Sequence, residues 1–561
     1  QERLFVLGEW HKTLKCKYYG MRATANWPGL PKIALTILFY ALLAVQVIWI
    51  FTLPLFPTQD GPVHIYYAHI IGALFSGSTI YSKYFYIQHI LPPYSLHYYY
   101  LIAAMKFFSA HAAEKQLVAG IVLLTATGFR AFTRILGDDS GIASLGVLPL
   151  LFHQSLLMGF YNYSLALGLG FWAATFWLRA TQKRNTGNWL AFLSLSYVLM
   201  LTHPVPVVLV LTFAGGELVA RIARNWSAMP AGSREKMGAY LAGYRRDIVF
   251  LFLSALSLGY IAAFINRSAK NLVPLRSAQE AFLKLLKASP VAAFADPGIA
   301  TSLYRVALWT ILLGSLYFGA RGILRRTRTA NWTVTDVLVV LSGLLVVLYP
   351  ILPPDINGSF YFSDRLMVAA WLVSVAAVSG AITNRFTQVA ILGFVLSFTV
   401  FVMVLAQQRI RPAAEKLAEI DSLPAAQPGN VGFLFAPSMP QTGLAVAPFW
   451  WAGVSYFERS DAVLLGSPWL ESHYMILSGR APLLTVDYPK EILSDPRVLM
   501  YQMVGSPEMD QKYLPLCRVL FIAAKPGDPT ADSAIKQFEQ QSGHRWRAEQ
   551  RDWFTVYTAV D

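Results

Sequence analysis

Long apolar stretches separated by short polar segments occupy most of the chain between residues 33 and 406. Several of them reach the roughly 20 residues that a helix needs to cross the hydrocarbon of a bilayer. If the basic clusters between the stretches all lie on one side of the membrane, the pattern predicts about eleven spanning helices. They are expected at residues 33–55, 117–135, 142–158, 161–179, 188–202, 204–220, 247–267, 300–320, 334–352, 364–382 and 386–406.

Two places in this pattern allow more than one arrangement. The apolar pieces on either side of His203-Pro204 form either two spans or one long helix, kinked at a proline that lacks a backbone N–H. Residues 95–110 form either a further span or a helix at the membrane surface. Two spans at His203 and a surface helix at 95–110 agree with every basic cluster.

Composition supports this class of protein. Hydrophobic residues make up 55% of the 561 residues and charged residues only 14%. A soluble domain normally carries about 25% charged residues. The lipid bilayer is therefore the expected surrounding of much of this surface.

The net charge of +15 is consistent with a membrane protein. Its basic residues lie between apolar stretches, as the positive-inside rule describes, and no separate basic patch with interleaved aromatic residues indicates a nucleic-acid partner. The basic residues 1–32 are expected in the cytoplasm, and the compact loops suit a bacterial inner membrane. The two cysteines, Cys16 and Cys517, exclude a disulfide framework, and no Walker A, GxSxG or HExxH motif occurs.

Two regions are expected outside the cytoplasm. The first outer loop, 56–115, contains Gly61-Pro62 followed by apolar and aromatic residues at helical spacing, which predicts an amphipathic helix at the membrane surface. Residues 407–561 carry more charge, more proline and short β-type runs at 431–435 and 519–523. About 150 residues suffice for one domain, so we expect a transmembrane part, 33–406, and an extracytoplasmic soluble α/β domain.

The most informative element is the segment Gln59-Asp60-Gly61-Pro62-Val63-His64. If a helix begins at Pro62, a favourable position for proline, Asp60 and His64 lie one turn apart on one face. A carboxylate beside an imidazole is a plausible catalytic base and its partner. The alternative is that Asp60 is only a turn residue, a common place for aspartate.

A second candidate is Arg365, which follows the polar segment 353–364 at the outer mouth of a predicted span. Positive charge at that side is unusual, and a guanidinium can hold a phosphate through two hydrogen bonds. Tyr361 lies beside it and is a candidate for substrate binding. The alternative is an Asp364–Arg365 surface arrangement without function, although adjacent helical residues do not face one another.

Three polar residues in outer turns complete the candidate substrate-binding set. Asn162 and Tyr163 join two apolar helices, where interfacial aromatics and a turn asparagine are the simpler explanation. His203 interrupts a hydrophobic run, and a histidine at that depth is a functional candidate. The alternative is that it only hydrogen-bonds a backbone carbonyl freed at the kink.

The segments QDGPVHIYYAHI and ILPPYSLHYYYLIAAMKFFS, placed after a first span, resemble the GT-C superfamily of membrane glycosyltransferases. The resemblance covers the architecture of the whole chain and implies a GT-C-like fold of transmembrane helices. In that family an aspartate near the start of the first outer loop is the catalytic base or, in some members, a metal ligand. Asp60 matches it. A common subset of the family has a second acid directly after this aspartate, whereas a glycine follows Asp60. The resemblance therefore does not establish metal use, and a divalent metal, Mg²⁺ or Mn²⁺, at Asp60 stays an alternative.

The resemblance further implies a polyprenyl-phosphate or polyprenyl-pyrophosphate sugar donor, with Arg365 near its phosphate. The acceptor would be a glycan, a lipid or a protein. Transfer by direct displacement inverts the anomeric carbon and needs only one base. Two rival functions are a transporter or flippase of a lipid-linked glycan, which would show discontinuous helices, and a non-catalytic membrane scaffold.

Overall fold

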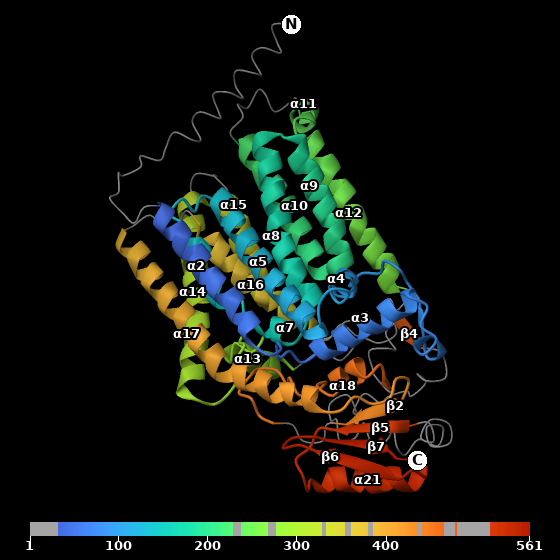
Figure 1. The fold of residues 1–561 in the computed structure, drawn as a ribbon. Helices are drawn as coiled ribbons and strands as arrows, with labels where there is room; N and C mark the ends of the chain where they lie inside the picture. The colour runs from blue at the N-terminus through green and yellow to red at the C-terminus, as the bar shows by residue number, and fades with distance from the viewer. Residues whose placement is uncertain are drawn as a thin grey trace.

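The computed structural model describes residues 32–227, 237–266, 277–327, 333–353, 361–379, 385–435, 440–464, 477–479 and 517–560. A bundle of helices forms one end of the molecule and a small sheet the other (Figure 1). Within the described ranges, six helices are long and apolar enough to cross a membrane. They are α2 (Lys32–Thr52), α5 (Ala110–Ile135), α10 (Pro204–Ser227), α12 (Arg245–Asn266), α14 (Ile299–Thr327) and α17 (Arg385–Leu417).

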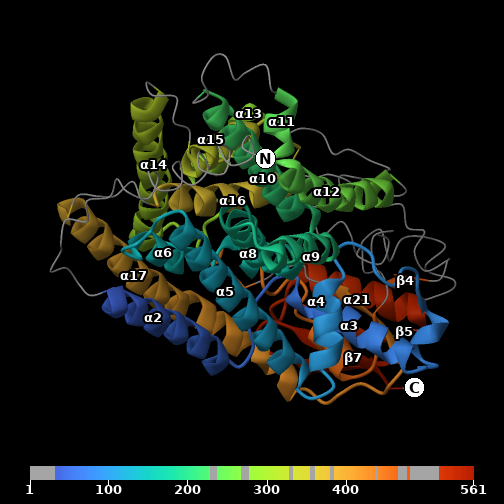
Figure 2. The same cartoon turned by 90° about the horizontal axis from the view of Figure 1, so that it is seen from above.

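Further helices complete the bundle. They are α8 (Tyr161–Lys183), α9 (Thr186–Thr202), α11 (Met237–Ala242), α13 (Ala278–Leu286), α15 (Val334–Leu348) and α16 (Phe362–Ala377). Seen from above, α2, α5 and α17 run alongside one another (Figure 2). A hydrogen bond of 2.9 Å from Trp49 Nε1 to Gln407 Oε1 joins α2 to α17.

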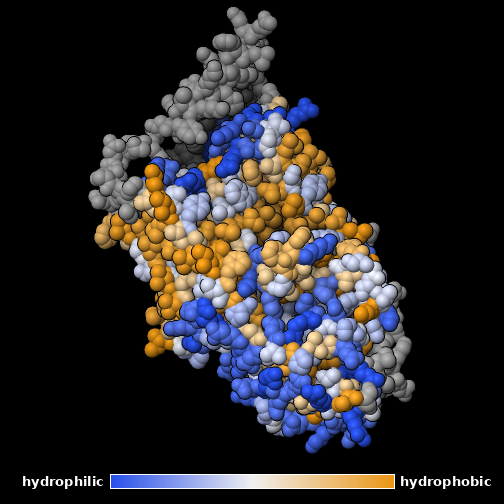
Figure 3. Space-filling model, viewed as in Figure 1, coloured by the Kyte–Doolittle hydropathy of each residue, from blue (hydrophilic) through white to orange (hydrophobic). Residues whose placement is uncertain are grey.

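The surface agrees with a membrane location. Figure 3 shows a mainly apolar surface over the bundle, whereas the sheet end and the end of the bundle near α11 are hydrophilic. Ile33, Phe252, Val306 and Phe386 are among the large apolar side chains exposed on the bundle helices. Side chains of this kind are stable in contact with lipid, so the chain is an integral membrane protein whose apolar helices face hydrocarbon.

The expected continuous span at 142–158 is wrong. This apolar segment is divided into α6 (Ile142–Leu145), the 3-10 turn η2 (Leu148–Leu150) and α7 (Gln154–Leu157). Pro149 donates no backbone hydrogen bond, and His153 has extended backbone with φ −97° and ψ 164°, so neither position continues a helix.

The two ambiguous places are resolved by the backbone. His203 is extended, with φ −163° and ψ 133°, between α9 and α10, which pack side by side. The His203-Pro204 pair is therefore a turn between two helices. At 95–110 the chain forms only α4 (Leu96–Ala104), whose 9 residues span about 14 Å at 1.5 Å per residue and are too short to cross a bilayer.

The first outer segment contains the helix predicted after Gly61-Pro62, namely α3 (Gly61–Phe75), followed by η1 (Tyr81–Lys83), β1 (Phe85–Ile87) and α4. Because α5 already begins at Ala110, the expected loop 56–115 ends inside that helix. Most of the α3 side chains are buried, since the helix lies between the bundle and the C-terminal region (Figure 1). Its aromatic side chains therefore pack against protein.

Helix α17 and the turn η4 (Ala418–Ser422) carry the chain past the domain boundary expected at residue 407. A five-stranded sheet follows, in the order β3-β2-β5-β7-β6. Strand β2 is parallel to β3 and β5, and β7 is antiparallel to β5 and β6. The bounds are β2 (Val431–Phe435), β3 (Val463–Leu464), β5 (Cys517–Ile522), β6 (Trp546–Gln550) and β7 (Thr555–Ala559), with helices α18 (Val454–Arg459) and α21 (Pro529–Ser542).

Both β-type runs seen in the sequence are therefore strands, which confirms a small C-terminal sheet. A short strand β4 (Leu477–Gly479) pairs with β1 and so joins the C-terminal region to the first outer segment. Cys517 is buried, and its Sγ donates to the Val519 carbonyl at 3.3 Å, while Cys16 lies outside the described residues.

Candidate active site

Asp60 lies in the turn that leads into α3, held against the turn between α7 and α8. The backbone N–H of Gln59 donates to the Leu157 carbonyl at 2.9 Å, and that of Asp60 to the Met158 carbonyl at 3.0 Å. Gly159 has a φ of +84°, and a Cβ there would lie 2.8 Å from the nitrogen of Gly61. Only glycine fits this close approach, so backbone contacts fix the position of Asp60.

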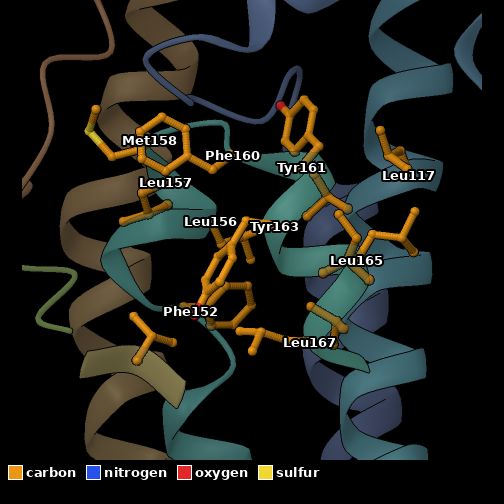
Figure 4. Packing of buried hydrophobic residues seen from close by; sticks show 14 of the residues in the cluster. Leu117, Phe152, Leu156, Leu157, Met158, Phe160, Tyr161, Tyr163, Leu165 and Leu167 are labelled. Atoms are coloured by element: carbon orange, nitrogen blue, oxygen red, sulfur yellow. The ribbon is translucent and has the colours of Figure 1, made fainter. Parts of the chain in front are cut away.

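Gly61 rests on a buried polar cluster made by Thr58, Glu114 and Tyr161. The Tyr161 hydroxyl donates to Glu114 Oε1 and lies 2.8 Å from the Thr58 hydroxyl, which is 3.2 Å from the same carboxylate oxygen. A Cβ on Gly61 would approach all three groups to 2.0–2.6 Å. Figure 4 shows the Tyr161 side chain pointing toward the loop above it, opposite to Tyr163. The glycine after Asp60 is thus a packing requirement.

The Asp60 side chain is 2% exposed, unlike a solvated turn residue. Asp60 occupies the N-cap position of α3, yet its carboxylate makes no capping hydrogen bond there. Burial raises the pKa of the carboxyl from 3.8 to about 7, against the opposing effects of the Arg365 charge and of side-chain hydrogen bonds from Gln59 and Trp451. This carboxyl therefore exchanges a proton near neutral pH, which suits general base catalysis.

His64 lies one turn further along α3 and is also buried. Its Nδ1 is 2.9 Å from the Tyr98 hydroxyl and 3.3 Å from His97 Nε2, and its ring is hydrogen-bonded to the backbone of Gly159. Burial lowers the pKa of His64 to about 3 and lowers that of His97 as well. Both imidazoles are therefore neutral and act as hydrogen-bonding groups.

Arg365 lies in the first turn of α16 and is only 6% exposed. Its guanidinium carbon is 4.1 Å from the centre of the Phe160 ring, a cation–π distance, and its Nη1 is 2.7 Å from His203 Nε2. The Tyr163 hydroxyl donates to the Arg365 carbonyl. The charge of Arg365 acts on both Asp60 and His64.

The fold therefore brings Asp60, His64, His203 and Arg365 together from three distant parts of the sequence. The alternative of an Asp364–Arg365 surface arrangement does not apply. Asp364 is buried and accepts a hydrogen bond of 2.9 Å from the Tyr349 hydroxyl, while Arg365 faces His203 and Phe160.

The two remaining candidates lie at helix starts beside this cluster. Tyr361 precedes α16 with a φ of 59°, rare for a bulky residue, and its ring is 5.9 Å from Phe160. Asn162 uses its side-chain oxygen to accept from the Tyr163 N–H at 2.7 Å, a local bond typical of a turn asparagine. Residues 354–360 of the polar segment lie outside the described residues.

Sequence reasoning missed several members of this site. His97 and Tyr98 were part of the segment that carried the family resemblance, but nothing in their spacing showed that they would face His64. Phe160 was visible only as one aromatic among many. Trp451 lies in the C-terminal region, and no local pattern indicated that it would act on the pKa of Asp60.

A divalent metal at Asp60 has little support from the donor set. Among the residues that the structure describes, no three or more His, Cys, Asp or Glu side chains are grouped to hold a metal ion. The groups that lower the pKa of the Asp60 carboxyl are the positive charge of Arg365 and hydrogen-bonding side chains. These surroundings suit a carboxylate that takes up a proton better than one that binds Mg²⁺ or Mn²⁺.

Comparisons with known proteins place the fold. The sequence matches no family model and no curated protein. In structure it is similar to ArnT from Cupriavidus metallidurans bound to undecaprenyl phosphate, with a TM-score of 0.50 and 13% identity over 94% of this chain and 98% of that chain. This chain has the ArnT fold. The apo structure of ArnT aligns over the same shares with 13% identity and a TM-score of 0.49.

This likeness confirms the expected architecture, in which a bundle of transmembrane helices is followed by a C-terminal region. The shared architecture includes the transmembrane helices and the C-terminal region, since nearly the whole length of both chains aligns. At 13% identity the likeness concerns the fold, and the chemistry must be argued from the side chains of this chain.

Proposed function

We propose that this protein is a membrane glycosyltransferase that moves a sugar from a polyprenyl-phosphate carrier to an acceptor at the extracytoplasmic face. The observation that carries the proposal is the buried pair of Asp60, whose pKa is about 7, and Arg365, in a chain with the ArnT fold. A base and a phosphate-binding cation in one site are what such a transfer requires.

The phosphate site follows from the hydrogen bonds of His203. The backbone N–H of Val205 lies 3.1 Å from Nδ1 of His203, and Nε2 of the same ring lies 2.7 Å from Arg365 Nη1. In the tautomer that carries its proton on Nε2, the imidazole and the guanidinium are both donors. In this proposal an oxygen of the carrier phosphate accepts from both.

The bound undecaprenyl phosphate of the ArnT structure supports the same class of carrier for this chain. A planar guanidinium held over Phe160 presents its N–H groups in a fixed direction, which suits a phosphate better than a flexible ammonium would. The Tyr163 hydroxyl donates to the Arg365 carbonyl, and the Tyr361 ring lies beside Phe160. In this proposal Tyr361 and Asn162 belong to the part of the site that binds the sugar.

In the proposed reaction the acceptor hydroxyl gives its proton to the Asp60 carboxylate while its oxygen forms a bond to the anomeric carbon. The bond from that carbon to the phosphate oxygen breaks, and its electron pair leaves with the carrier phosphate. Arg365 and His203 stabilise the charge that develops there. Phosphate is a good leaving group, so the reaction needs no general acid, and one-step displacement inverts the anomeric centre.

His64 has a supporting role in this proposal. As a neutral ring tied to Tyr98 and Gly159, it keeps the face of α3 beside Asp60 in place and offers a hydrogen bond without adding charge. The proposed acceptor is a glycan, a lipid or a protein, entering from the water side or within the outer leaflet.

The decisive experiment is sugar transfer from radiolabelled polyprenyl-phosphate donors by the purified wild type and by Asp60→Asn. The wild type should transfer the sugar, and Asp60→Asn should lose about 100-fold or more in rate while still binding the donor. Wild-type protein that binds the donor but leaves the sugar on it would favour a lipid-glycan transporter, the function that the broken segment Ile142–Leu157 would also suit.

A further inference from the structure

The first turn of α4 contacts the helix that follows the proposed base. The Tyr98 hydroxyl lies 2.9 Å from His64 Nδ1, and His97 Nε2 lies 3.3 Å from the same nitrogen. The rings of His97 and His64 meet edge to face, with their centres 4.9 Å apart. Because His64 lies one turn beyond Asp60, the start of α4 is held on the side of the site that contains the base.

The residues just before α4 contact the side of the site that contains the phosphate-binding groups. The Ser95 N–H donates to the Leu201 carbonyl at 2.9 Å, near the end of α9, and the Tyr94 ring lies 4.9 Å from the ring of His203. Helix α4 lies beside both α3 and α9 (Figures 1 and 2). In the proposed reaction the sugar lies between the base and the phosphate, so it lies against residues 94–98.

Two buried polar atoms of this segment, Ser95 Oγ and His97 Nδ1, have no hydrogen-bond partner among the described residues. Ser95 is 1% exposed and His97 0%. Ser95 occupies the N-cap position of α4, where a serine side chain usually accepts a backbone N–H, yet it makes no such bond. Buried polar atoms are nearly always hydrogen-bonded. A pair without partners beside a substrate site therefore indicates groups that bind the substrate.

The backbone in front of this pair is strained. Tyr94 has a φ of 71°, in the left-handed region that a bulky side chain rarely adopts. Strain of this kind concentrates at ligand-binding sites, where the surrounding structure holds it in place. The bond from the Ser95 N–H to α9 and the contact of the Tyr94 ring with His203 hold this conformation.

The polar groups of residues 94–98 are uncharged. The segment contains no Asp, Glu, Lys or Arg, and burial lowers the pKa of His97 well below its usual range, so its imidazole is neutral. A sugar hydroxyl both donates and accepts, so it can pair with Nδ1 of His97 in either tautomer and with the Ser95 hydroxyl. A charged sugar group would find no opposite charge in this segment.

We propose that Ser95 and His97 form the donor-sugar subsite and bind hydroxyl groups of a neutral sugar held between Asp60 and the carrier phosphate. This inference rests on the proposed glycosyltransferase function and adds the chemical class of the sugar. Buried hydrogen-bonding groups discriminate strongly between substrates, because a sugar without the matching hydroxyl leaves them unpaired.

The test measures the affinity of the purified protein for undecaprenyl phosphate alone and for undecaprenyl phosphate carrying glucose, mannose, galactose or arabinose. In the wild type at least one of these neutral sugars should bind more tightly than the bare carrier. Ser95→Ala and His97→Gln should each reduce this gain about threefold to tenfold, because a hydrogen bond to the sugar is lost, with the affinity for the bare carrier little changed.

Two further variants make the comparison specific. The amide of His97→Gln lies near the position of Nε2, whereas the amide of His97→Asn lies near that of Nδ1, so His97→Asn should keep more of the gain than His97→Gln. Ser254→Ala is the matched control for Ser95→Ala. Ser254 is 0% exposed, its hydroxyl also lacks a partner among the described residues, and it lies in α12. Its variant should keep the whole gain.

Full gain in both Ser95→Ala and His97→Gln would overturn the inference and leave the proposed function standing. Equal affinity of the wild type for the bare carrier and for every neutral sugar would also overturn it. Tighter binding of undecaprenyl phosphate carrying glucosamine, whose amine is charged, than of every neutral sugar would contradict the neutral class. A wild type that binds the donor but transfers no sugar would disprove the proposed function, and the affinities would still test the subsite.

Discussion

Nη1 of Arg365 lies 2.7 Å from Nε2 of His203, although the two residues are 162 positions apart in the sequence. In the tautomer in which Nδ1 accepts from the Val205 N–H, Nε2 carries the proton and both groups are donors. The arrangement is therefore suited to receive an anion, and it gives the proposed phosphate site its sharpest test.

Arg365→Gln should weaken binding of undecaprenyl phosphate about tenfold or more, since a charge-assisted hydrogen bond to phosphate is lost. His203→Phe should weaken it less. The double variant should lose less binding free energy than the sum of the losses in the two single variants, because both donors bind one phosphate oxygen. Arg305→Gln, at an arginine that donates to the Ala295 carbonyl, is the matched control. Equal affinity in the wild type and Arg365→Gln would place the phosphate elsewhere.

The pH dependence of transfer should report the ionisation of Asp60. Only the deprotonated carboxylate accepts the proton of the acceptor, and burial raises the pKa of this group to about 7. The value of kcat/KM should therefore rise with pH and level off above about pH 7. A profile that is flat from about pH 5 to about pH 8, measured with one donor and one acceptor, would contradict Asp60 as the base.

Asp60→Asn should be more stable than the wild type at neutral pH. The folded pKa is raised from 3.8 to about 7, so the folded state holds the proton more tightly than the unfolded state, and stability falls as pH rises between these values. The difference corresponds to about 4 kcal/mol above pH 7 and should vanish near pH 4. Thermal unfolding of both proteins at about pH 4 and about pH 8 measures this stability difference. A difference of the same size at both pH values would show that it does not come from the ionisation of Asp60.

Gly61→Ala should destabilise the protein, because its methyl group would meet Thr58, Glu114 and Tyr161 at 2.0–2.6 Å. Overpacking of this kind costs about 1–3 kcal/mol or more. Gly72→Ala is the control in the same helix. Its methyl group would find its nearest neighbour at 3.5 Å, so stability should hold or rise. Equal melting temperatures of the two variants would show that the polar cluster can move aside.

Sequence alone determined the class of the protein. The length of the apolar stretches fixes which segments can cross a bilayer, because hydrocarbon leaves no alternative partner for backbone polar groups. The same local logic located the helix after Gly61-Pro62 and the strand at 431–435. Asp60 and Arg365 stood out because charge beside long apolar segments is rare, although their roles stay proposals.

Only the tertiary structure decided what surrounds those two residues. Local pattern placed α3 at a membrane surface, yet the C-terminal region covers it, since Tyr66 and His69 find partners far away in the sequence. The apolar run at 142–158 likewise gave no sign that the chain forms three short helical segments there. Contacts such as the hydrogen bond from the Ala447 N–H to the Gln59 side chain depend on how separate elements pack. Hydrophobic periodicity predicts the length of each helix or strand and which of its faces is apolar. Which other element packs against that face depends on the assembly of the whole fold.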